Sequence, residues 1–285
     1  MNFLILTRFP KEYEPTRLKT EAKNLGLDPL ILSYKKIAIK DNNVVLDNGK
    51  YSLSQFKYII PRAASGPSGS LVNQKTALLK NLSDNQTCLN KESFLKYPLT
   101  GKILQSEIFK DVLPIVPSFV FYQKKDWENF LKSAEFPLIV KGAFGSHGKQ
   151  VFAVDDKNQA KKIICRQNWQ KLVFQPLITS PFWVRALVLK GKFLGAIPRK
   201  TKSRFLPKAE TKLPEKLKQK DLKEIEKISL KAVKILKTDF AGIDFLNHQG
   251  KWLLLELNRT PQFKIFEKKT SVNVAKEILT SLVEK

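Results

Sequence analysis

The chain has 285 residues, of which 42% are hydrophobic and 27% charged, and its formal net charge is +25. A chain of this length can bury about two or three hydrophobic cores. Its hydrophobic and charged fractions are those of an ordinary soluble globular protein. No apolar run approaches the ~20 residues that span a bilayer, and the first strand-like segment is too short for a signal peptide, so we expect no membrane segment.

Cysteine and histidine are scarce and widely spaced. Cys88 and Cys165 are the only cysteines, and they lack metal-ligand spacing. A reduced, cytoplasmic setting is the simplest interpretation, and neither thiol is expected to be catalytic. His147 and His248 are too few and too scattered for a zinc site.

The positive charge comes almost entirely from lysine, since only eight of the 51 basic residues are arginine. Arginine is the usual bidentate reader of phosphates and base edges, whereas dispersed lysine is typical of a solvated surface. The chain shows no RNP-type aromatic motif, helix-turn-helix signature or zinc finger. A lysine-rich nucleic-acid-binding protein therefore remains an alternative interpretation and not the leading one.

Residues 1–98 alternate strand and helix patterns, which indicates an open α/β unit. The small and polar stretch 63–70 predicts a loop at the mouth of a site. The expected elements are strands at Phe3–Leu6, Leu30–Leu32 and Tyr58–Pro61, a helix at Pro15–Leu25 ending near Gly26, and a hairpin around Asp47–Gly49.

Residues 99–177 contain a glycine-rich turn between two strands. A buried strand ends at Lys141, a turn follows, and strand character resumes at Val151. Gly145 and Gly148 would let backbone N–H groups approach an anion, and Lys141 would supply a compact charge. The turn is neither a Walker loop nor a dinucleotide fingerprint, and an ordinary turn is the alternative. The region is also expected to hold Lys102 near a helix start, a strand at Ser118–Phe121 and a helix after Asp126.

Residues 178–285 contain a long amphipathic helix and a candidate metal site. Apolar residues from Leu222 to Leu236 recur at helical spacing, so the intervening lysines form a solvated face. Further on, Asp244 ends one strand, and Glu256 and Asn258 end the returning strand of a hairpin. Because side chains alternate with period two, Glu256 and Asn258 share a face. Few hard oxygen ligands suit Mg²⁺, although a polar rim on an edge hairpin is the alternative.

The ordered set of these residues resembles the ATP-grasp superfamily, over roughly residues 58–282. It is most similar to the RimK-like branch, which contains ribosomal-protein glutamate ligases and the amino-acid-carrier-protein ligases of lysine biosynthesis. The resemblance implies an ATP-grasp fold of α/β and α+β type, in which an N-terminal open α/β domain (1–98) precedes two subdomains that grip ATP (99–177 and 178–285). The set comprises Lys102, Lys141, the Gly145–Gly148 turn, Gln175–Ile178, Arg185, Arg199, Asp244, Glu256 and Asn258.

The resemblance implies a role for each position. ATP phosphates would be bound by Lys102, Lys141, Gly145, Ser146, His147 and Gly148, and adenine would be held at the hinge residues Gln175, Leu177 and Ile178. Mg²⁺, or Mn²⁺ in its place, would be bound by Asp244, Glu256 and Asn258. Arg185 and Arg199 would be catalytic and would steady the reacting acyl group, and Arg62, Lys200 and Arg204 would approach the substrate.

The implied function is Mg²⁺/ATP-dependent ligation of a carboxylate to an amine through an acylphosphate, with an amino acid, a peptide, an acidic protein tail or a small carboxylate as partners. An ATP-binding pseudo-enzyme is a further alternative, and a homo-oligomer is not excluded. The chain departs from the family at Gly101, Pro176 and Gln262, where Asp, an acidic residue and Gly are frequent. The Arg-Ser-Asn element of glutamate ligases is replaced by Arg204-Phe205-Leu206, so the resemblance does not extend to glutamate as the added amino acid.

Overall fold

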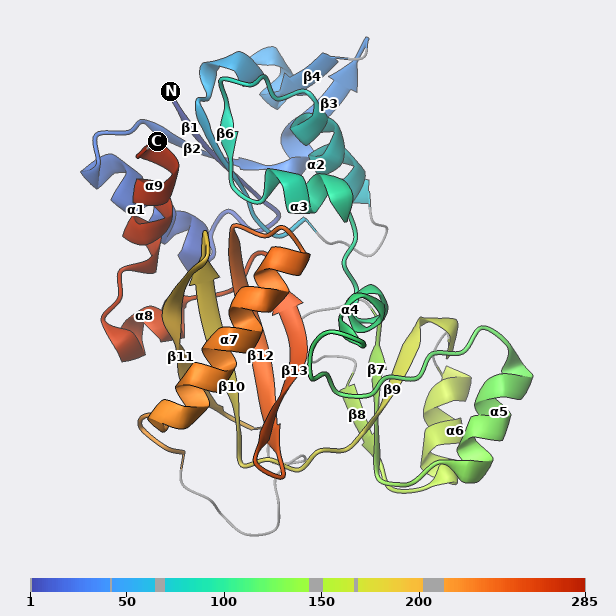
Figure 1. Ribbon diagram of the computed structural model, residues 1–285. Coiled ribbons are helices and arrows are strands. Elements are labelled where there is room, and N and C mark those ends of the chain that lie inside the picture. The colour runs from blue at the N-terminus through green and yellow to red at the C-terminus, as the bar shows by residue number, and fades with distance from the viewer. Residues whose placement is uncertain are drawn as a thin grey trace.

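The computed structural model describes residues 2–41, 43–64, 70–143, 151–166, 169–201 and 213–284, and it contains three main sheets (Figure 1). The N-terminal sheet is parallel with the order β2-β1-β5-β6. Its strands are β1 (Phe3–Thr7), β2 (Pro29–Ser33), β5 (Tyr58–Pro61) and β6 (Thr87–Cys88), and its helices are α1 (Tyr13–Asn24), α2 (Ser70–Lys80) and α3 (Lys91–Lys96). These elements confirm the predicted open α/β unit.

The predicted hairpin around Asp47–Gly49 is displaced in the structure. The strands that pair are β3 (Ile37–Lys40) and β4 (Asn43–Leu46), so the hairpin turn precedes the predicted one. Asp47, Asn48 and Gly49 all have positive φ and form a tight turn that is closed by one bridge, between Leu46 and Tyr51. The turn chemistry was therefore identified correctly, but it ends the hairpin and does not connect its strands.

The central region forms a small antiparallel sheet with the order β8-β7-β9, flanked by two helices that lie on its outer side (Figure 1). Its elements are α4 (Lys102–Phe109), α5 (Lys124–Ser133), β7 (Leu138–Gly142), β8 (Val151–Val154), α6 (Lys157–Arg166) and β9 (Leu172–Pro176). The β7–β8 hairpin and the position of Lys102 at a helix start are as predicted. Helix α5 begins at Lys124, before Asp126 and not after it.

The strand predicted at Ser118–Phe121 is wrong. Only Phe119 pairs, through one bridge to Phe174. The aromatic residues of this segment pack on a helix instead of on a strand, because the Phe130 ring of α5 lies 4.8 Å from Phe119 and 5.0 Å from Phe121, and Phe119 stays 40% exposed. An alternating apolar pattern indicates which residues face a core, but aromatic packing can satisfy it without a strand ladder.

The C-terminal sheet is antiparallel with the order β11-β10-β12-β13, and α7 packs across one face of it (Figure 1). The β12–β13 hairpin turns at Gln249 and Gly250, whose φ values of 50° and 83° are those of a two-residue turn that matches strand twist. The elements are β10 (Phe182–Leu189), β11 (Lys192–Lys200), α7 (Gln219–Ile235), β12 (Phe240–His248), β13 (Lys251–Asn258), α8 (Lys264–Thr270) and α9 (Val274–Val283). The three sheets fall within the three predicted regions, whose exact boundaries stay a prediction.

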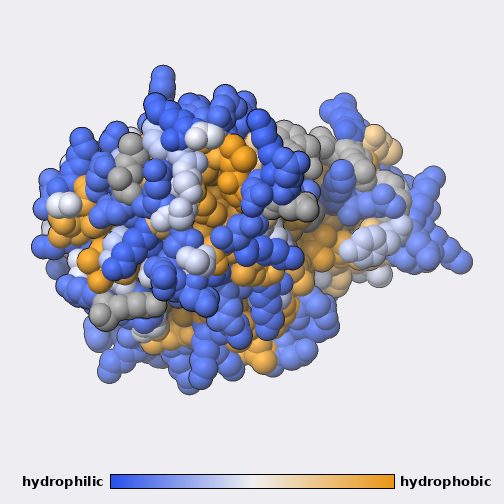
Figure 2. Space-filling view, turned by 90° about the horizontal axis from the view of Figure 1, so that it is seen from above, coloured by the Kyte–Doolittle hydropathy of each residue, from blue (hydrophilic) through white to orange (hydrophobic). Residues whose placement is uncertain are grey.

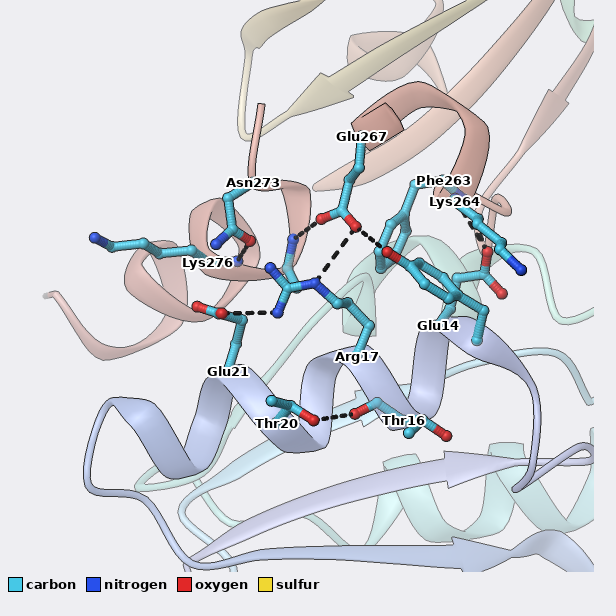
Figure 3. A network of polar contacts seen from close by, with 12 residues as sticks. Glu14, Thr16, Arg17, Thr20, Glu21, Phe263, Lys264, Glu267, Asn273 and Lys276 are labelled. Atoms are coloured by element: carbon cyan, nitrogen blue, oxygen red, sulfur yellow. Dashed lines mark hydrogen bonds and ion pairs between the residues drawn. The ribbon is translucent and has the colours of Figure 1, made fainter. Parts of the chain in front are cut away.

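A polar network attaches the N-terminal unit to the last two helices (Figure 3). Glu14 is buried on α1 and accepts hydrogen bonds from the backbone N–H groups of Phe263 and Lys264 at 3.1 and 3.3 Å. These N–H groups begin α8, so the Glu14 carboxylate caps that helix. The Arg17 guanidinium lies 3.5 Å from Glu267 of α8. The chain thus returns from the C-terminal sheet to close the core around α1 and α9.

Asn90 is a second link between the two units, and its loss should be costly. It is buried with φ 62°, its amide donates to the carbonyl groups of Phe240 and Arg259 at 2.9 and 2.8 Å, and its side-chain oxygen accepts from Phe240 N at 2.8 Å. Asn90→Ala should lower the free energy of unfolding by about 2–4 kcal/mol, because each unpaired buried polar group costs about 1–3 kcal/mol. Urea unfolding measures this. Asn43→Ala, at an exposed hairpin residue, should stay within about 0.5 kcal/mol of the parent protein, and an equal loss in both variants would contradict the role of Asn90.

The surface is mostly hydrophilic in the view from above, where apolar side chains form interrupted patches (Figure 2). This distribution agrees with a lysine-rich solvated coat. Among the helices in the described part of the chain, none combines the length and apolar character that crossing a bilayer requires.

Candidate active site

Two carboxylates meet across the β12–β13 hairpin. Asp244 and Glu256 are cross-strand partners, and the register shifts between Asp244 and Phe245 because Leu255 of β13 has no partner on β12. Asn258 donates from Nδ2 to Glu256 Oε1 at 2.9 Å, so these two side chains lie on one face as the period-two pattern predicts. Asp244 is only 5% exposed. Burial raises the pKa of Asp244 to about 6, although the nearby Arg185 guanidinium opposes the shift.

Arg185 forms a bidentate ion pair with Asp244 from the neighbouring strand β10. Its Nε and Nη2 atoms lie 2.7 Å from Oδ1 and Oδ2 of the carboxylate. The pair is a register pair of β10 and β12, so the sheet itself places the two charges face to face. Burial lowers the pKa of Arg185, but the charge and hydrogen bonds of Asp244, together with the charges of Glu256 and Glu14, outweigh burial, and the pKa lies above its usual value.

Two lysines from the central region approach the same face. Lys102 is the first residue of α4, and its Nζ lies 3.7 Å from Glu256 Oε2. Lys141 is a 5% exposed residue of β7. Burial favours the neutral acid at Glu256, but Lys102, the Asn258 hydrogen bond and Lys141 outweigh it and hold the pKa of Glu256 below its usual value. The arrangement brings two carboxylates and two lysines together from four elements.

Lys141 should give nucleotide binding a pH dependence. Burial, with a further contribution from the Lys102 charge, lowers the pKa of Lys141 to about 8. The ammonium form is therefore present below pH 8 and is lost as pH rises through that value, so affinity for an anionic nucleotide should fall between pH 7 and pH 9. Lys141→Arg should flatten this profile, since a guanidinium stays protonated. Titration calorimetry with ADP at several pH values measures it, and identical profiles for both proteins would contradict the assignment.

Trp183 is a residue that sequence reasoning missed. Its indole ring on β10 lies 5.3 Å from the Arg185 guanidinium carbon and 5.2 Å from that of Arg199. Arg199 is the cross-strand partner of Trp183 on β11. Burial and the Arg185 charge lower the pKa of Arg199. One aromatic ring therefore contacts both candidate catalytic arginines. The sequence gives no sign of this, because it shows only a tryptophan two positions before one of the arginines.

The hinge residues lie at the end of β9. Gln175 is buried and donates from Nε2 to Ser118 Oγ at 2.7 Å. Leu177 N donates to Pro137 O at 3.0 Å, and Ile178 is buried. A cavity of about 20 Å³ joins the Gln175 side to Lys102. It is far smaller than the ~300 Å³ or more of ordinary ligand pockets, so this cavity by itself is too small to hold a nucleotide.

The candidate substrate residues have different surroundings. Arg62 is buried, donates to Pro261 O at 3.1 Å and lies over the Phe263 ring at 5.8 Å, so it forms part of the contact between β5 and the segment after β13. Lys200 is exposed at the end of β11. The remaining predicted residues, Gly145, Ser146, His147, Gly148 and Arg204, lie outside the described residues.

The donor set fits a magnesium ion better than a transition metal. Among the described residues, no group of three or more His, Cys, Asp or Glu side chains is placed to hold a metal. Mg²⁺ needs only one or two carboxylates, because water and substrate phosphates complete its octahedron. Asp244, Glu256 and the Asn258 amide oxygen meet that requirement, and the lysines beside them suit a phosphate-bound ion.

The sequence model of the RimK-like ATP-grasp domain family matches residues 75–282 of this chain. The chain belongs to the RimK-like ATP-grasp family. This confirms the resemblance stated above, and the matched range includes every candidate residue from Lys102 to Asn258, whereas Arg62 precedes it.

Relatives of the RimK-like chain agree with this assignment. A probable alpha-L-glutamate ligase of Legionella pneumophila (strain Corby) is 24% identical over 295 residues, which cover 100% of this chain and 96% of that protein. The uncharacterized protein MG012 of Mycoplasma genitalium (strain G37) is 31% identical over 154 residues. The match covers 53% of this chain and 53% of MG012, which is about half of each protein.

The solved structure of the ATP-grasp ligase PsnB, complexed with a phosphomimetic variant of a minimal precursor, Mg and ADP, has a TM-score of 0.72 to this chain. It is 14% identical, with 99% of this chain and 97% of PsnB covered. This likeness shows the ATP-grasp fold. As a RimK-like ATP-grasp protein, the chain is an ATP-dependent carboxylate–amine ligase, which confirms the predicted enzyme class.

Proposed function

We propose that the ligase reaction takes place at the face of the β10–β13 sheet that carries Asp244 and Glu256. The observation that supports this is the convergence of the buried Asp244 and the half-buried Glu256 with cations from separate elements: Lys102, Lys141 and Arg185. Buried charge is costly unless it is paired or functional, so such a cluster in a known enzyme fold is a candidate active site.

In the proposed reaction, a substrate carboxylate attacks the γ-phosphorus of ATP and ADP leaves, which gives an acylphosphate. The amine of the second substrate then attacks the acyl carbon, inorganic phosphate leaves, and an amide forms with loss of a proton. Lys102 and Lys141 neutralise the charge that develops on the transferred phosphoryl group. Arg185 and Arg199, held on Trp183, face the oxyanion of the acyl intermediate. No protein nucleophile is needed.

Asp244, Glu256 and Asn258 would hold Mg²⁺, or Mn²⁺ in its place. When bound, the ion supplies charge that orients and neutralises the nucleotide phosphates. The Arg185 guanidinium uses Nε and Nη2 for Asp244. This leaves the two N–H groups of Nη1 and the second N–H of Nη2 to meet a substrate oxygen.

The proposed substrates are an amino acid and a peptide, protein tail or small carboxylate. Two comparisons support this class: the Legionella relative is named a glutamate ligase, and PsnB is complexed with a precursor. The net charge of +25 favours an acidic acceptor. Glutamate belongs in any test panel, but the sequence at 204–206 does not single it out.

The test is ADP release with Mg²⁺ and ATP across a panel of amino acids and short acidic peptides, with products identified by mass. Release that needs both an acid and an amine, with a mass equal to their condensation product, would establish the reaction and name the substrates. Tight ATP binding without release would indicate a pseudo-enzyme. Binding of the protein to nucleic acid that does not depend on ATP and weakens steeply as the salt concentration rises would indicate a lysine-rich nucleic-acid-binding protein instead.

A further inference from the structure

Beside the candidate metal ligands, the outer edge of β13 is closed by a side chain and not by another strand. β13 is the last strand in the sheet order, so backbone groups along one side of it have no strand partner. At Leu254 that side bonds the backbone of Pro114 and Val116. At Leu257 it bonds one glutamine: Gln105 Nε2 donates to Leu257 O at 3.0 Å, and Gln105 Oε1 accepts from Leu257 N at 2.7 Å.

Leu257 lies directly between the two candidate metal ligands of β13. Its neighbours are Glu256 and Asn258, and the Gln105 amide holds the Leu257 N–H and C=O as a neighbouring strand would. The end of β13 would otherwise be an unsupported edge, because it is followed at once by an irregular segment. Gln105 therefore restrains the backbone from which both ligands extend.

The same side chain also places Lys102. Gln105 is three residues after Lys102 on α4, and residues at this spacing share a helix face. With Gln105 bound to β13, the Lys102 ammonium lies 3.7 Å from Glu256. The distance between the candidate phosphate-binding lysine and the candidate metal ligand is thus set where α4 meets the strand edge.

The burial of Gln105 supports a specific role. It is 7% exposed, and a polar side chain at such a position is costly unless every group is paired. Packing alone would be served by an apolar residue, but that residue would leave the Leu257 N–H and C=O without the bonds that Gln105 supplies.

We propose that Gln105 is a positioning residue of the ligase, which holds Glu256, Asn258 and Lys102 in the relative placement that binding of a Mg²⁺–nucleotide complex requires. The inference rests on the function proposed above. If Gln105 has this role, its replacement should weaken the effect of Mg²⁺ on the Kd of the nucleotide, in addition to any loss of stability.

The experiment compares Gln105→Met with Gln86→Met. Methionine keeps the length of glutamine but makes neither bond. Gln86 is a matched control, since it is also buried, donates to Leu53 O and Phe56 O at 2.8 and 2.7 Å, and accepts from Ser83 N, all within the N-terminal unit. Calorimetry gives the Kd of ADP in MgCl₂ and in EDTA, and the ratio of the two is the benefit from Mg²⁺.

Gln105→Met should reduce that ratio by about tenfold or more, as for other residues that orient metal ligands. Gln86→Met should lower Tm and leave the ratio unchanged. Gln105→Asn provides a second variant in case methionine prevents folding, because it keeps an uncharged amide but is one methylene shorter, so it cannot reach both Leu257 groups in the same way. Its ratio should fall between those of the parent and Gln105→Met.

A ratio for both Gln105 variants equal to that of the parent protein would overturn the inference and leave Gln105 as a fold contact. A parent protein that binds ADP equally with and without Mg²⁺ would overturn the proposed metal site and this inference with it. The two failures are distinguishable, because only the second appears in the parent protein.

Discussion

Glu256→Gln should lower kcat for ADP release by about 100-fold or more, since it removes an anionic ligand from the site where phosphate charge is balanced. The fold should survive, because glutamine keeps the size of the side chain and can still accept the Asn258 hydrogen bond. Steady-state assays with Mg²⁺ and ATP, together with thermal unfolding, measure both effects.

The matched control for Glu256→Gln is Glu277→Gln. Glu277 also pairs with a lysine, at 2.8 Å from Lys192, but this pair is largely exposed on the surface. A surface pair contributes about 0–1 kcal/mol, so neither turnover nor Tm should change noticeably. Unchanged turnover in Glu256→Gln would remove this residue from the metal site.

Arg185→Met should reduce the free energy of unfolding by about 3–5 kcal/mol, because it leaves Asp244 as a buried carboxylate without its bidentate partner. Activity should be lost as well. The double variant Arg185→Met/Asp244→Asn should recover part of the stability, since it removes the unpaired charge, and should stay inactive. Denaturant unfolding of the parent, both single variants and the double variant gives the coupling energy of the pair.

Arg199→Met is the control for Arg185→Met. Arg199 stacks on the same Trp183 ring at a similar distance, so its loss removes a cation–π contact while Asp244 keeps its partner. The stability loss should be near 1 kcal/mol, as for a single contact of this kind. If Arg185→Met were no less stable than Arg199→Met, the ion pair would not be the stabilising interaction.

The local sequence pattern was sufficient to predict the part of the candidate site that lies within one hairpin. The two apolar runs on either side of the turn predict β12 and β13, although β12 continues to His248 and does not end at Asp244 as expected. The period of two correctly places Glu256 and Asn258 on one face. The helix from Gln219 and the β7–β8 hairpin are also readable from periodicity. The segment 118–121 shows the limit of this reasoning, because Phe119 and Phe121 pack against the Phe130 ring and do not form a strand.

Other contacts join residues far apart in the chain and have no local signature. Arg185 and Asp244 are 59 residues apart, and Gln105 and Leu257 are 152 apart. The first pair depends on the order of strands in the sheet, and the second on the packing of α4 against the edge of that sheet. No residue spacing in a single sequence indicates either arrangement. The predicted roles at Gly145–Gly148 and Arg204 stay predictions.

The sequence by itself determined the family, the residue types available for phosphate and metal binding, and the hairpin that carries the carboxylates, because these depend on ordered motifs and on a period of two. Only the tertiary structure decided which charges meet: Arg185 with Asp244, Lys102 with Glu256, and both arginines on Trp183. The physical reason is that charge pairing and desolvation act through distances of a few ångströms, and those distances are set by strand order and helix packing.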